Sequence, residues 1–438
     1  MEEALSLYKH ALEAEKQRLG ETGNTSAHSN LLLNLYTNVG TVLMQLGRID
    51  EATQYFLLGS AAGSNVTSGS PFTSGHTEAT LVSHLWRASK VVSNWTHFET
   101  HWRQLEMWTD AADIASDFPL LPFDALLTPF DDQRRMELAI RFAQRMEKKW
   151  SKMLTTAALK NVRPNSSTRH MKAPVTIAYL SHDFNDHPTG QMMEGLFLHH
   201  NNSVVDCRVV MYGKHDGSRT RKAIESVAQS RLGGFHDLSG SDLDHSMNLL
   251  QRLQTDICFD AQVFTLGNRA ELLVTRPCTI QASFLVFPGT SGASWLDFLV
   301  ADPGVVPPEH CKSYTEKMLY MPHTYQINYY SPSVLGRGGG GGGKRITTSK
   351  ATGRPFKADK NNMVYCNFNK LDKLEPKGFS LWLNVLHRSP RSLLWLLKPS
   401  SENAWHAAKR NLELEALAHG IDSSRIVWAN RVSKQAHL

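Results

Sequence analysis

The chain has 438 residues, of which 41% are apolar and 20% charged, as expected for a soluble globular protein with two or three domains. The 47 basic residues exceed the 41 acidic ones only slightly, and the excess is spread along the sequence, so it does not indicate binding to nucleic acid. No apolar run approaches the 20 residues of a membrane span and no signal peptide opens the chain, so we expect no membrane partner.

The five cysteines have no CxxC spacing, so the sequence predicts no zinc site. Several of them lie within apolar runs, and we expect all five to be buried free thiols. That state is typical of a reducing compartment, and we expect a cytoplasmic or nuclear protein. The cysteines are Cys207, Cys258, Cys278, Cys311 and Cys366.

Residues 1–63 show the pattern of tetratricopeptide-like helices, in which small residues occur where two helices touch and an aromatic residue lies between them. Gly40 and Gly59 are placed for close helix approach, beside Tyr36 and Phe56, and Gly47 marks the turn between the two helices. A plain helical hairpin without a binding role is the alternative.

Residues 64–172 are predicted to form a helical linker region. A polar loop is expected over 64–77, followed by helices that carry an aromatic stripe from Trp95 to Trp108. An amphipathic helix is predicted over 131–146, and a basic linker follows it.

Residues 173–330 alternate between strand and helix patterns, which predicts a mostly parallel sheet. The first strand, 175–179, runs into a polar loop that ends at Pro188, which suits the first turn of a helix. In open α/β sheets ligands bind at the carboxyl ends of strands, so we expect the ionisable groups of this loop to be functional. The alternative is that Asp183 only caps a turn and that the histidines are solvated. The other expected strands are 207–211, 256–259, 280–285 and 298–301.

Residues 331–360 contain six consecutive glycines from Gly338 to Gly343 and are predicted to be a flexible insert. A second α/β unit is predicted over 361–438, with strands at 363–368, 393–397 and 426–428.

Four motifs in this order resemble the protein O-linked N-acetylglucosamine transferases, over roughly residues 90 to 438. The segment Asp183–Thr189 reads DFNDHPT, Leu285–Ala293 reads LVFPGTSGA, and Tyr320–Thr324 reads YMPHT. The fourth, Asn367–Asn369, reads NFN and precedes Lys373. The resemblance implies an α/β fold with an all-α N-terminal region: tetratricopeptide-like helices followed by two Rossmann-like lobes of the GT-B type.

The resemblance implies transfer of N-acetylglucosamine from UDP-GlcNAc to Ser/Thr hydroxyls of intracellular proteins. Asp183 and His187 match the acid/base or proton-relay groups, and which of the two accepts the proton stays open. No metal or other cofactor is expected, because lysine and helix-terminal amides could stabilise the diphosphate. The residues expected to bind the donor or acceptor are Thr189, Val286, Pro288, Gly289, Lys373, Lys434 and His437.

The chain also departs from the family pattern. Phe123 and Asp124 replace a histidine-rich motif, Val263 replaces a glycine, and Val286 stands where the family has a glycine that borders the sugar. The sequence stops at Leu438, before a turn that completes the family's diphosphate site, so we expect a truncated second lobe and a fragment that is inactive alone.

Two alternatives remain open. One is a protein O-fucosyltransferase that uses GDP-fucose, although Gly289–Gly292 and Met321–Thr324 favour the N-acetylglucosamine branch. The other is a non-catalytic tetratricopeptide scaffold with a degenerate sugar site, which Val286 and Val263 favour.

Overall fold

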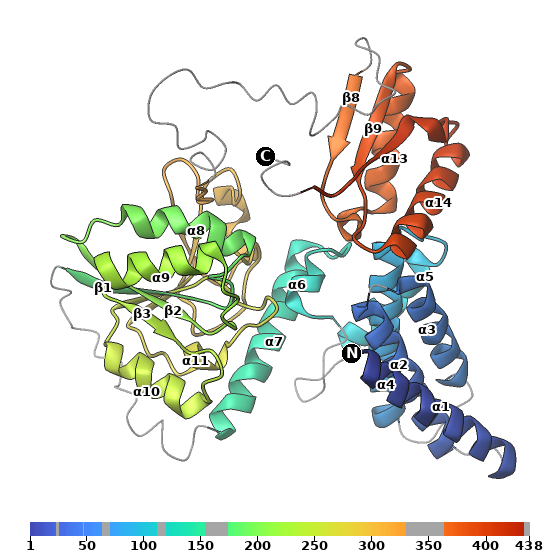
Figure 1. Ribbon diagram of the computed structural model, residues 1–438, viewed down its shortest axis with the longest axis horizontal. Helices are drawn as coiled ribbons and strands as arrows, with labels where there is room; N and C mark the ends of the chain where they lie inside the picture. The colour runs from blue at the N-terminus through green and yellow to red at the C-terminus, as the bar shows by residue number, and fades with distance from the viewer. Residues whose placement is uncertain are drawn as a thin grey trace. The chain divides into compact units, whose positions relative to one another are not determined.

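A computed structural model describes residues 1–22, 26–46, 48–63, 71–111, 120–153, 174–329 and 363–432 (Figure 1). The chain divides into two compact units, one of Met1–Leu120 with Lys344–Leu438 and one of Leu121–Gly343. None of the described helices is long and apolar enough to cross a membrane.

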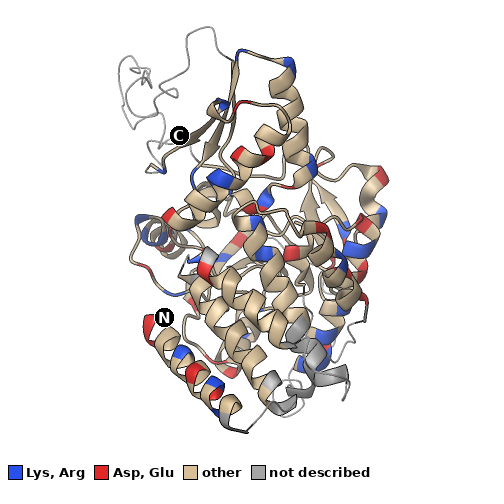
Figure 2. Cartoon of the chain, turned by 90° about the vertical axis from the view of Figure 1, so that its right-hand side faces the viewer, with Lys and Arg blue, Asp and Glu red and all other residues tan. Residues whose placement is uncertain are grey.

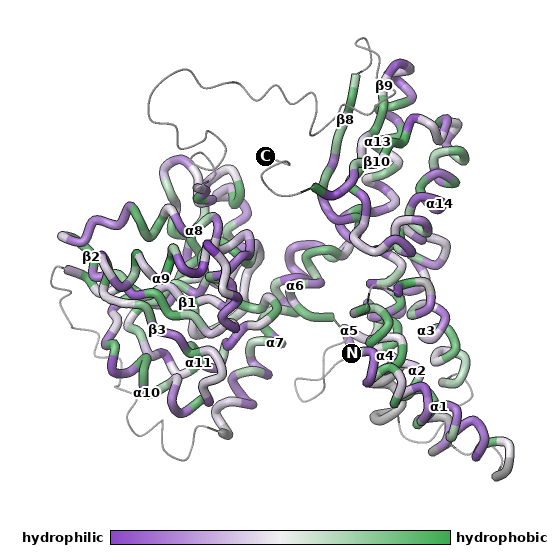
Figure 3. The backbone as a smooth tube through the Cα atoms, viewed as in Figure 1, coloured by the Kyte–Doolittle hydropathy of each residue, from purple (hydrophilic) through white to green (hydrophobic). Residues whose placement is uncertain are grey.

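The first unit begins with helices that pack through small residues. A Cβ atom on Gly40 would lie 2.4 Å from the ring of Phe56, and one on Gly59 would lie 3.2 Å from Tyr36, so both glycines permit close helix contact as predicted. Acidic and basic residues alternate along the helix at the N-terminus (Figure 2), whose hydropathy also alternates (Figure 3). The helices are α1 (Glu2–Thr22), α2 (Ser26–Gln45), α3 (Ile49–Gly63), α4 (Pro71–Val91) and α5 (Phe98–Ala111).

The same unit contains a small parallel sheet with strand order β10-β9-β8. Its strands lie where the sequence pattern places them. The elements are β8 (Met363–Asn367), the 3-10 helix η4 (Leu371–Lys373), α13 (Pro376–Arg388), β9 (Ser392–Leu397), α14 (Glu402–Ala418), η5 (Ser423–Arg425) and β10 (Ile426–Ala429).

Residues from both ends of the sequence share one core in this unit. Ala404 and Ala407 of α14 are buried in the cluster that also contains Phe56 and Leu81 of the N-terminal helices. The Asn411 side chain donates a hydrogen bond to the carbonyl of Val92 at 2.9 Å. The tetratricopeptide-like helices are therefore packed directly against the second α/β region.

The second unit is a seven-stranded parallel sheet with order β3-β2-β1-β4-β5-β6-β7. Its helices are α6 (Pro122–Ala125), α7 (Asp132–Met153), α8 (Pro188–His199), α9 (Arg219–Arg231), α10 (Leu243–Leu253), α11 (Glu271–Val274) and the 3-10 helix η3 (Pro308–Ser313). Its strands are β1 (Val175–Ser181), β2 (Val205–Met211), β3 (Phe235–Asp237), β4 (Ile257–Asp260), β5 (Ile280–Ser283), β6 (Phe298–Ala301) and β7 (Lys317–Tyr320).

Both faces of this sheet are covered, which explains the continuous apolar pattern of β1. Ile177 and Tyr179 point into a cluster with α8 and α9, whereas Ala178 and Leu180 point into a cluster with α7, α10 and α11. Figure 1 shows these helices on the two sides of the sheet. The predicted α/β fold with an all-α N-terminal region is confirmed.

The sequence interpretation was wrong at three places. Strands β3 and β7 were not predicted, because both are short edge strands without a fully buried apolar run. Residues 71–77 begin α4 and are not part of a polar loop, since Pro71 occupies the first position of a helix, where a missing N–H has no cost. Gly47 and the six-glycine run lie outside the described residues.

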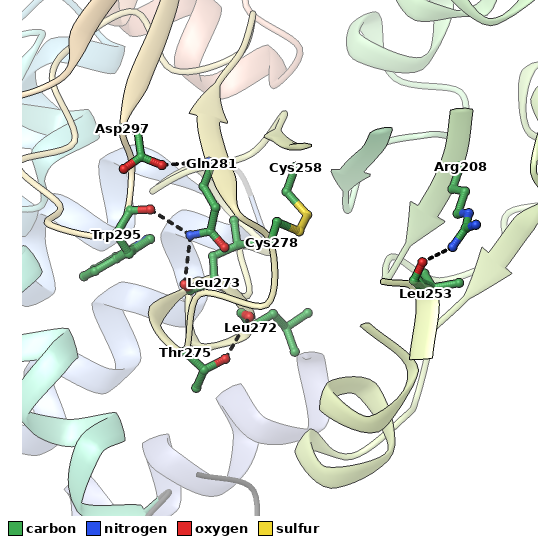
Figure 4. The surroundings of a disulfide bond; sticks show 10 residues. All are labelled: Arg208, Leu253, Cys258, Leu272, Leu273, Thr275, Cys278, Gln281, Trp295 and Asp297. Atoms are coloured by element: carbon green, nitrogen blue, oxygen red, sulfur yellow. Dashed lines mark hydrogen bonds between the residues drawn. A yellow bond between two sulfur atoms is a disulfide. The ribbon is translucent and has the colours of Figure 1, made fainter. Parts of the chain in front are cut away.

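The third error concerns the cysteines. Cys258 on β4 and Cys278 just before β5 form a disulfide with a Cα–Cα distance of 5.9 Å (Figure 4). The two strands are neighbours in the sheet, with Ile257 opposite Ile280, so residues 20 positions apart in sequence meet in space. Cys207, Cys311 and Cys366 are free, and only the first of these is buried.

Candidate active site

The polar loop after β1 lies at the point where the strand order of the sheet reverses. β1 pairs with β2 on one side and with β4 on the other, and the helices that follow β1 and β4, α8 and α11, lie on opposite faces. The carboxyl ends of two such strands flank the crevice in which α/β folds bind ligands. The loop 182–187 after β1 and the loop 261–269 after β4 therefore form the candidate site.

Asp183 is the centre of this site, and its side chain is only 13% exposed. Its Oδ1 atom lies 2.8 Å from Nδ1 of His182, and its Oδ2 atom accepts a hydrogen bond from the Gln262 side chain at 3.1 Å. Nδ1 of His187 lies 3.5 Å from the same Oδ2. The predicted pair Asp183 and His187 is thus brought together, and a second histidine joins it.

His187 has a structural role in addition to its place beside Asp183. It is the N-cap of α8, and its Nδ1 accepts a hydrogen bond from the amide of Thr189 at 3.3 Å. Pro188 occupies the first turn, as predicted. The Thr189 hydroxyl is buried against the same ring at 3.1 Å, so it supports His187 from inside the helix start.

Gln262 connects the two loops and is 1% exposed. Its Oε1 accepts hydrogen bonds from the Ser181 hydroxyl at 2.8 Å and from the His182 amide at 3.2 Å. Its Nε2 donates to Asp183 and, at 2.7 Å, to the carbonyl of Leu266. All four hydrogen-bonding positions of the amide are used, so Gln262 fixes the loop after β1 to the loop after β4.

The loop after β4 contains a residue in the left-handed region of backbone conformation. Val263 has φ of 50° and is 2% exposed, an uncommon conformation for a β-branched side chain. Val263 and Gln262 both donate their amides to Oδ1 of Asp260 at 3.0 Å. Burial raises the pKa of Asp260 to about 6, against the opposite effect of these two hydrogen bonds.

The loop after β5 carries three of the predicted substrate-binding residues. Leu285 has φ of 73°, and the Val286 amide donates to the Phe284 carbonyl at 2.9 Å, which together define a strained γ-turn. Val286 is partly buried, Pro288 is exposed and Gly289 is buried. A Cβ on Gly289 would lie 2.8 Å from Leu126, so the segment around α6 borders this loop.

A buried carboxylate holds the rest of that loop in place. Glu316 is 4% exposed and accepts hydrogen bonds from the Thr290 hydroxyl and the Ser291 amide, both at 2.7 Å. Gly292 has φ of 65°, and a Cβ there would lie 2.2 Å from the backbone of α7. The absence of a side chain at Gly292 therefore permits the close approach of this loop to α7, and a close approach at this glycine was predicted from the motif.

Lys373 belongs to the first unit, at the end of η4. Its ammonium group donates a hydrogen bond to the Asn369 side chain at 3.3 Å, and the lysine is exposed. It follows β8 and the segment Asn367–Asn369 in the order that the sequence predicts. Lys434 and His437 lie outside the described residues.

Sequence reasoning did not assign a role to three residues of these sites, namely His182, Gln262 and Glu316. Nothing in a single sequence separates a buried Glu316 from an exposed glutamate. His182 and Gln262 are 80 positions apart and meet only because β1 and β4 are neighbours. Within the described ranges, no group of three or more His, Cys, Asp or Glu side chains is arranged so that it could hold a metal ion.

The comparison with protein families decides the assignment. The model of glycosyl transferase family 41 matches residues 92–332 and 342–438, which include the four motifs that carry the resemblance. The chain belongs to this family. The expected resemblance over roughly residues 90 to 438 is therefore confirmed.

Two relatives of this chain carry names that state a peptide glycosylation activity. The chain is 26% identical to "Probable UDP-N-acetylglucosamine--peptide N-acetylglucosaminyltransferase SEC" of Arabidopsis thaliana, over 72% of this chain and 31% of the relative. It is 21% identical to the UDP-N-acetylglucosamine--peptide N-acetylglucosaminyltransferase of Caenorhabditis elegans, over 80% of this chain and 38% of the relative. The chain thus spans about a third of the length of these two relatives.

A solved structure supports the fold of this family 41 chain. A point mutant of the O-GlcNAc transferase of Thermobaculum terrenum superimposes with a TM-score of 0.63 at 16% sequence identity. The match covers 98% of this chain and 76% of that protein. It supports the arrangement of helices followed by two α/β lobes.

Proposed function

We propose that this protein transfers N-acetylglucosamine from UDP-GlcNAc to Ser/Thr hydroxyls of proteins. The observation that carries the proposal is the cluster around Asp183 at the strand-order reversal of a family 41 lobe. A carboxylate with two imidazoles can remove a proton from a hydroxyl near neutral pH. The names of the relatives point to the same donor and to peptide acceptors.

The reaction has two requirements that this family 41 chain can meet with its own side chains. The acceptor hydroxyl must lose a proton as it attacks the anomeric carbon, and the diphosphate must leave as an anion. We assign the first task to the Asp183 cluster and the second to Lys373, with Thr189, Val286, Pro288 and Gly289 proposed to border the substrates. Lys434 and His437 are proposed to contact the uridine.

We also propose that no metal ion takes part. An exposed ammonium group such as that of Lys373 can stabilise the charge that develops on the leaving diphosphate. Transfer should therefore continue in the presence of EDTA at the rate seen without it. Loss of transfer on chelation, restored by Mg²⁺ or Mn²⁺, would contradict this part of the proposal.

The test of the function is transfer of radiolabelled sugar to serine-containing peptides by the complete product of the gene. Lys373→Ala should lower turnover by an amount equivalent to roughly 2–4 kcal/mol of transition-state stabilisation, because one charge-assisted contact to the departing anion is lost. The melting temperature should stay unchanged, since the side chain is exposed. Lys377→Ala, at an exposed lysine on the adjacent helix α13, is the matched control and should retain normal turnover.

Three results would count against the proposal. Equal turnover in the Lys373→Ala and parent proteins would remove the lysine from the reaction. Transfer from GDP-fucose but not from UDP-GlcNAc would replace the proposed donor, and no transfer from either would favour a scaffold with a degenerate site.

A further inference from the structure

His182 and His187 both contact Asp183, but their rings are held in opposite ways. Nδ1 of His182 lies 2.8 Å from Oδ1 of Asp183. A carboxylate oxygen only accepts hydrogen bonds, so Nδ1 must carry the proton of the neutral ring. The lone pair of His182 is then on Nε2, and no described residue forms a hydrogen bond with that atom.

His187 has the other arrangement. Its Nδ1 accepts the amide hydrogen of Thr189 at 3.3 Å, which places the lone pair on Nδ1 and the proton on Nε2. Oδ2 of Asp183 lies 3.5 Å from the same Nδ1 and forms no hydrogen bond with it, so this carboxylate does not hold a proton there as it does on His182. The Thr189 hydroxyl, at 3.1 Å, occupies the same side of the ring. Neutral His187 thus presents a donor at Nε2 and has no free lone pair with which to accept a proton.

The surroundings of His182 fix its ring in place. Gln262 holds Asp183 from the β4 side and also accepts the hydrogen bond of the His182 amide. Gly267, with φ of 81°, lies against the ring, and a Cβ there would come within 2.6 Å of it. The side chain nevertheless remains 37% exposed, so a substrate can reach it.

We infer that His182, through Nε2, is the residue that takes the proton from the acceptor hydroxyl, with Asp183 orienting its ring and Gln262 positioning Asp183. The inference rests on the proposed function. The hydroxyl oxygen forms the bond to the anomeric carbon, the bond from that carbon to the diphosphate oxygen breaks, and the hydroxyl proton moves to Nε2. The diphosphate leaves with the electron pair of the broken bond.

The first test needs no activity. Two-bond ¹H–¹⁵N correlation spectra of the 438-residue chain with labelled histidine distinguish the two neutral tautomers. His182, identified by the signal missing in His182→Gln, should be protonated at Nδ1, and His187 at Nε2. Gln262→Leu should shift the His182 signals, since Asp183 loses its amide donor.

Gln281→Leu is the matched control for that variant. Gln281 is also fully buried and donates hydrogen bonds to the carbonyls of Leu273 and Trp295 at 3.0 and 2.7 Å (Figure 4). It lies on β5 and has no contact with Asp183, so its loss should leave the His182 signals in place. If Gln262→Leu fails to fold, Gln262→Glu keeps the shape of the side chain and removes the same donor.

The second test is kinetic and uses the complete gene product with UDP-GlcNAc and a peptide. His182→Gln should lower kcat by about 10²- to 10⁴-fold with little change in KM, as for loss of a general base. Asp183→Asn should also lower kcat, because a carboxamide can hold the imidazole in the wrong tautomer. His245→Gln, at an exposed histidine on α10, should leave both constants unchanged.

The outcomes separate this inference from the proposed function. A His182 ring protonated at Nε2, or near-normal kcat in His182→Gln, overturns the inference even if transfer from UDP-GlcNAc occurs. Absence of transfer in the parent protein counts against the proposed function alone, and the tautomer spectra then decide whether His182 is held as we infer.

Discussion

Gln262 and Asp260, two buried polar side chains near the end of β4, differ in how completely their polar atoms are hydrogen-bonded. The Gln262 side chain donates two hydrogen bonds and accepts two. Because none of its polar positions is left without a partner, burying this neutral amide should cost the folded protein little stability. Asp260 is 4% exposed and receives two backbone hydrogen bonds, both on the same oxygen. Its charge is therefore poorly compensated, which is the physical cause of its raised pKa.

Asp260→Asn should change how stability depends on pH. Burial raises the pKa of Asp260 from 3.8 to about 6, so the native state retains the proton that the unfolded state loses. The resulting stabilisation is complete below pH 4 and is lost as pH rises through 6, a change of about 3 kcal/mol. The variant has no such charge. Its free energy of unfolding relative to the parent should rise by about that amount between pH 4 and pH 7, measured by urea denaturation, and a constant difference would contradict the assignment.

At the scale of elements, sequence patterns located the interior strands of the seven-stranded sheet and missed its two edge strands. The interior strands β1, β2, β4, β5 and β6 were all predicted within a few residues, because burial on both faces gives a continuous apolar run. The edge strands β3 and β7 have no such pattern. The candidate site was located from one loop, but the contribution of Gln262 depends on which strands are neighbours, and the local sequence does not contain that information.

Replacing glycine by alanine in the N-terminal helices should change the free energy of unfolding in opposite directions at two positions. Gly40→Ala should lower the free energy of unfolding by about 1–3 kcal/mol, since the new Cβ would overlap the buried ring of Phe56. Gly20→Ala on α1 should raise it by up to about 1 kcal/mol, because no atom lies within 4 Å of its Cβ and alanine favours the helix. Thermal melting of both variants would show the difference, and equal effects would argue against the close contact of α2 with α3.

At the scale of the whole molecule, the first unit is discontinuous in sequence. Its N-terminal helices and its small parallel sheet are separated by the entire second unit, yet α14 contributes to the core of the helices. Lys90, which is almost completely buried, lies 3.6 Å from Glu375 at the start of α13. The two segments should therefore lose structure together.

Ala407→Glu tests this coupling. A glutamate at a position that is 2% exposed would bury an unpaired charge in the shared core, which should destabilise both 1–120 and 363–432. Limited proteolysis should then cut both segments faster and leave 174–329 as resistant as before. Ala418→Glu, at an exposed position on the same helix, is the control. Faster cleavage of only one segment in Ala407→Glu would contradict a common core.

Because the first unit is discontinuous in sequence, its N-terminal helices are synthesised first but can complete their core only after the second unit has been synthesised. A ribosome releases the N-terminal helices first, but Ala404 and Ala407, which complete their core, emerge only after the whole seven-stranded unit. Contacts across more than 300 positions form slowly, because a long loop must close before they contribute. During translation the apolar surface that α14 covers in the folded protein therefore stays exposed until α14 has been synthesised. We expect the N-terminal helices of the nascent chain to be a preferred binding site for chaperones.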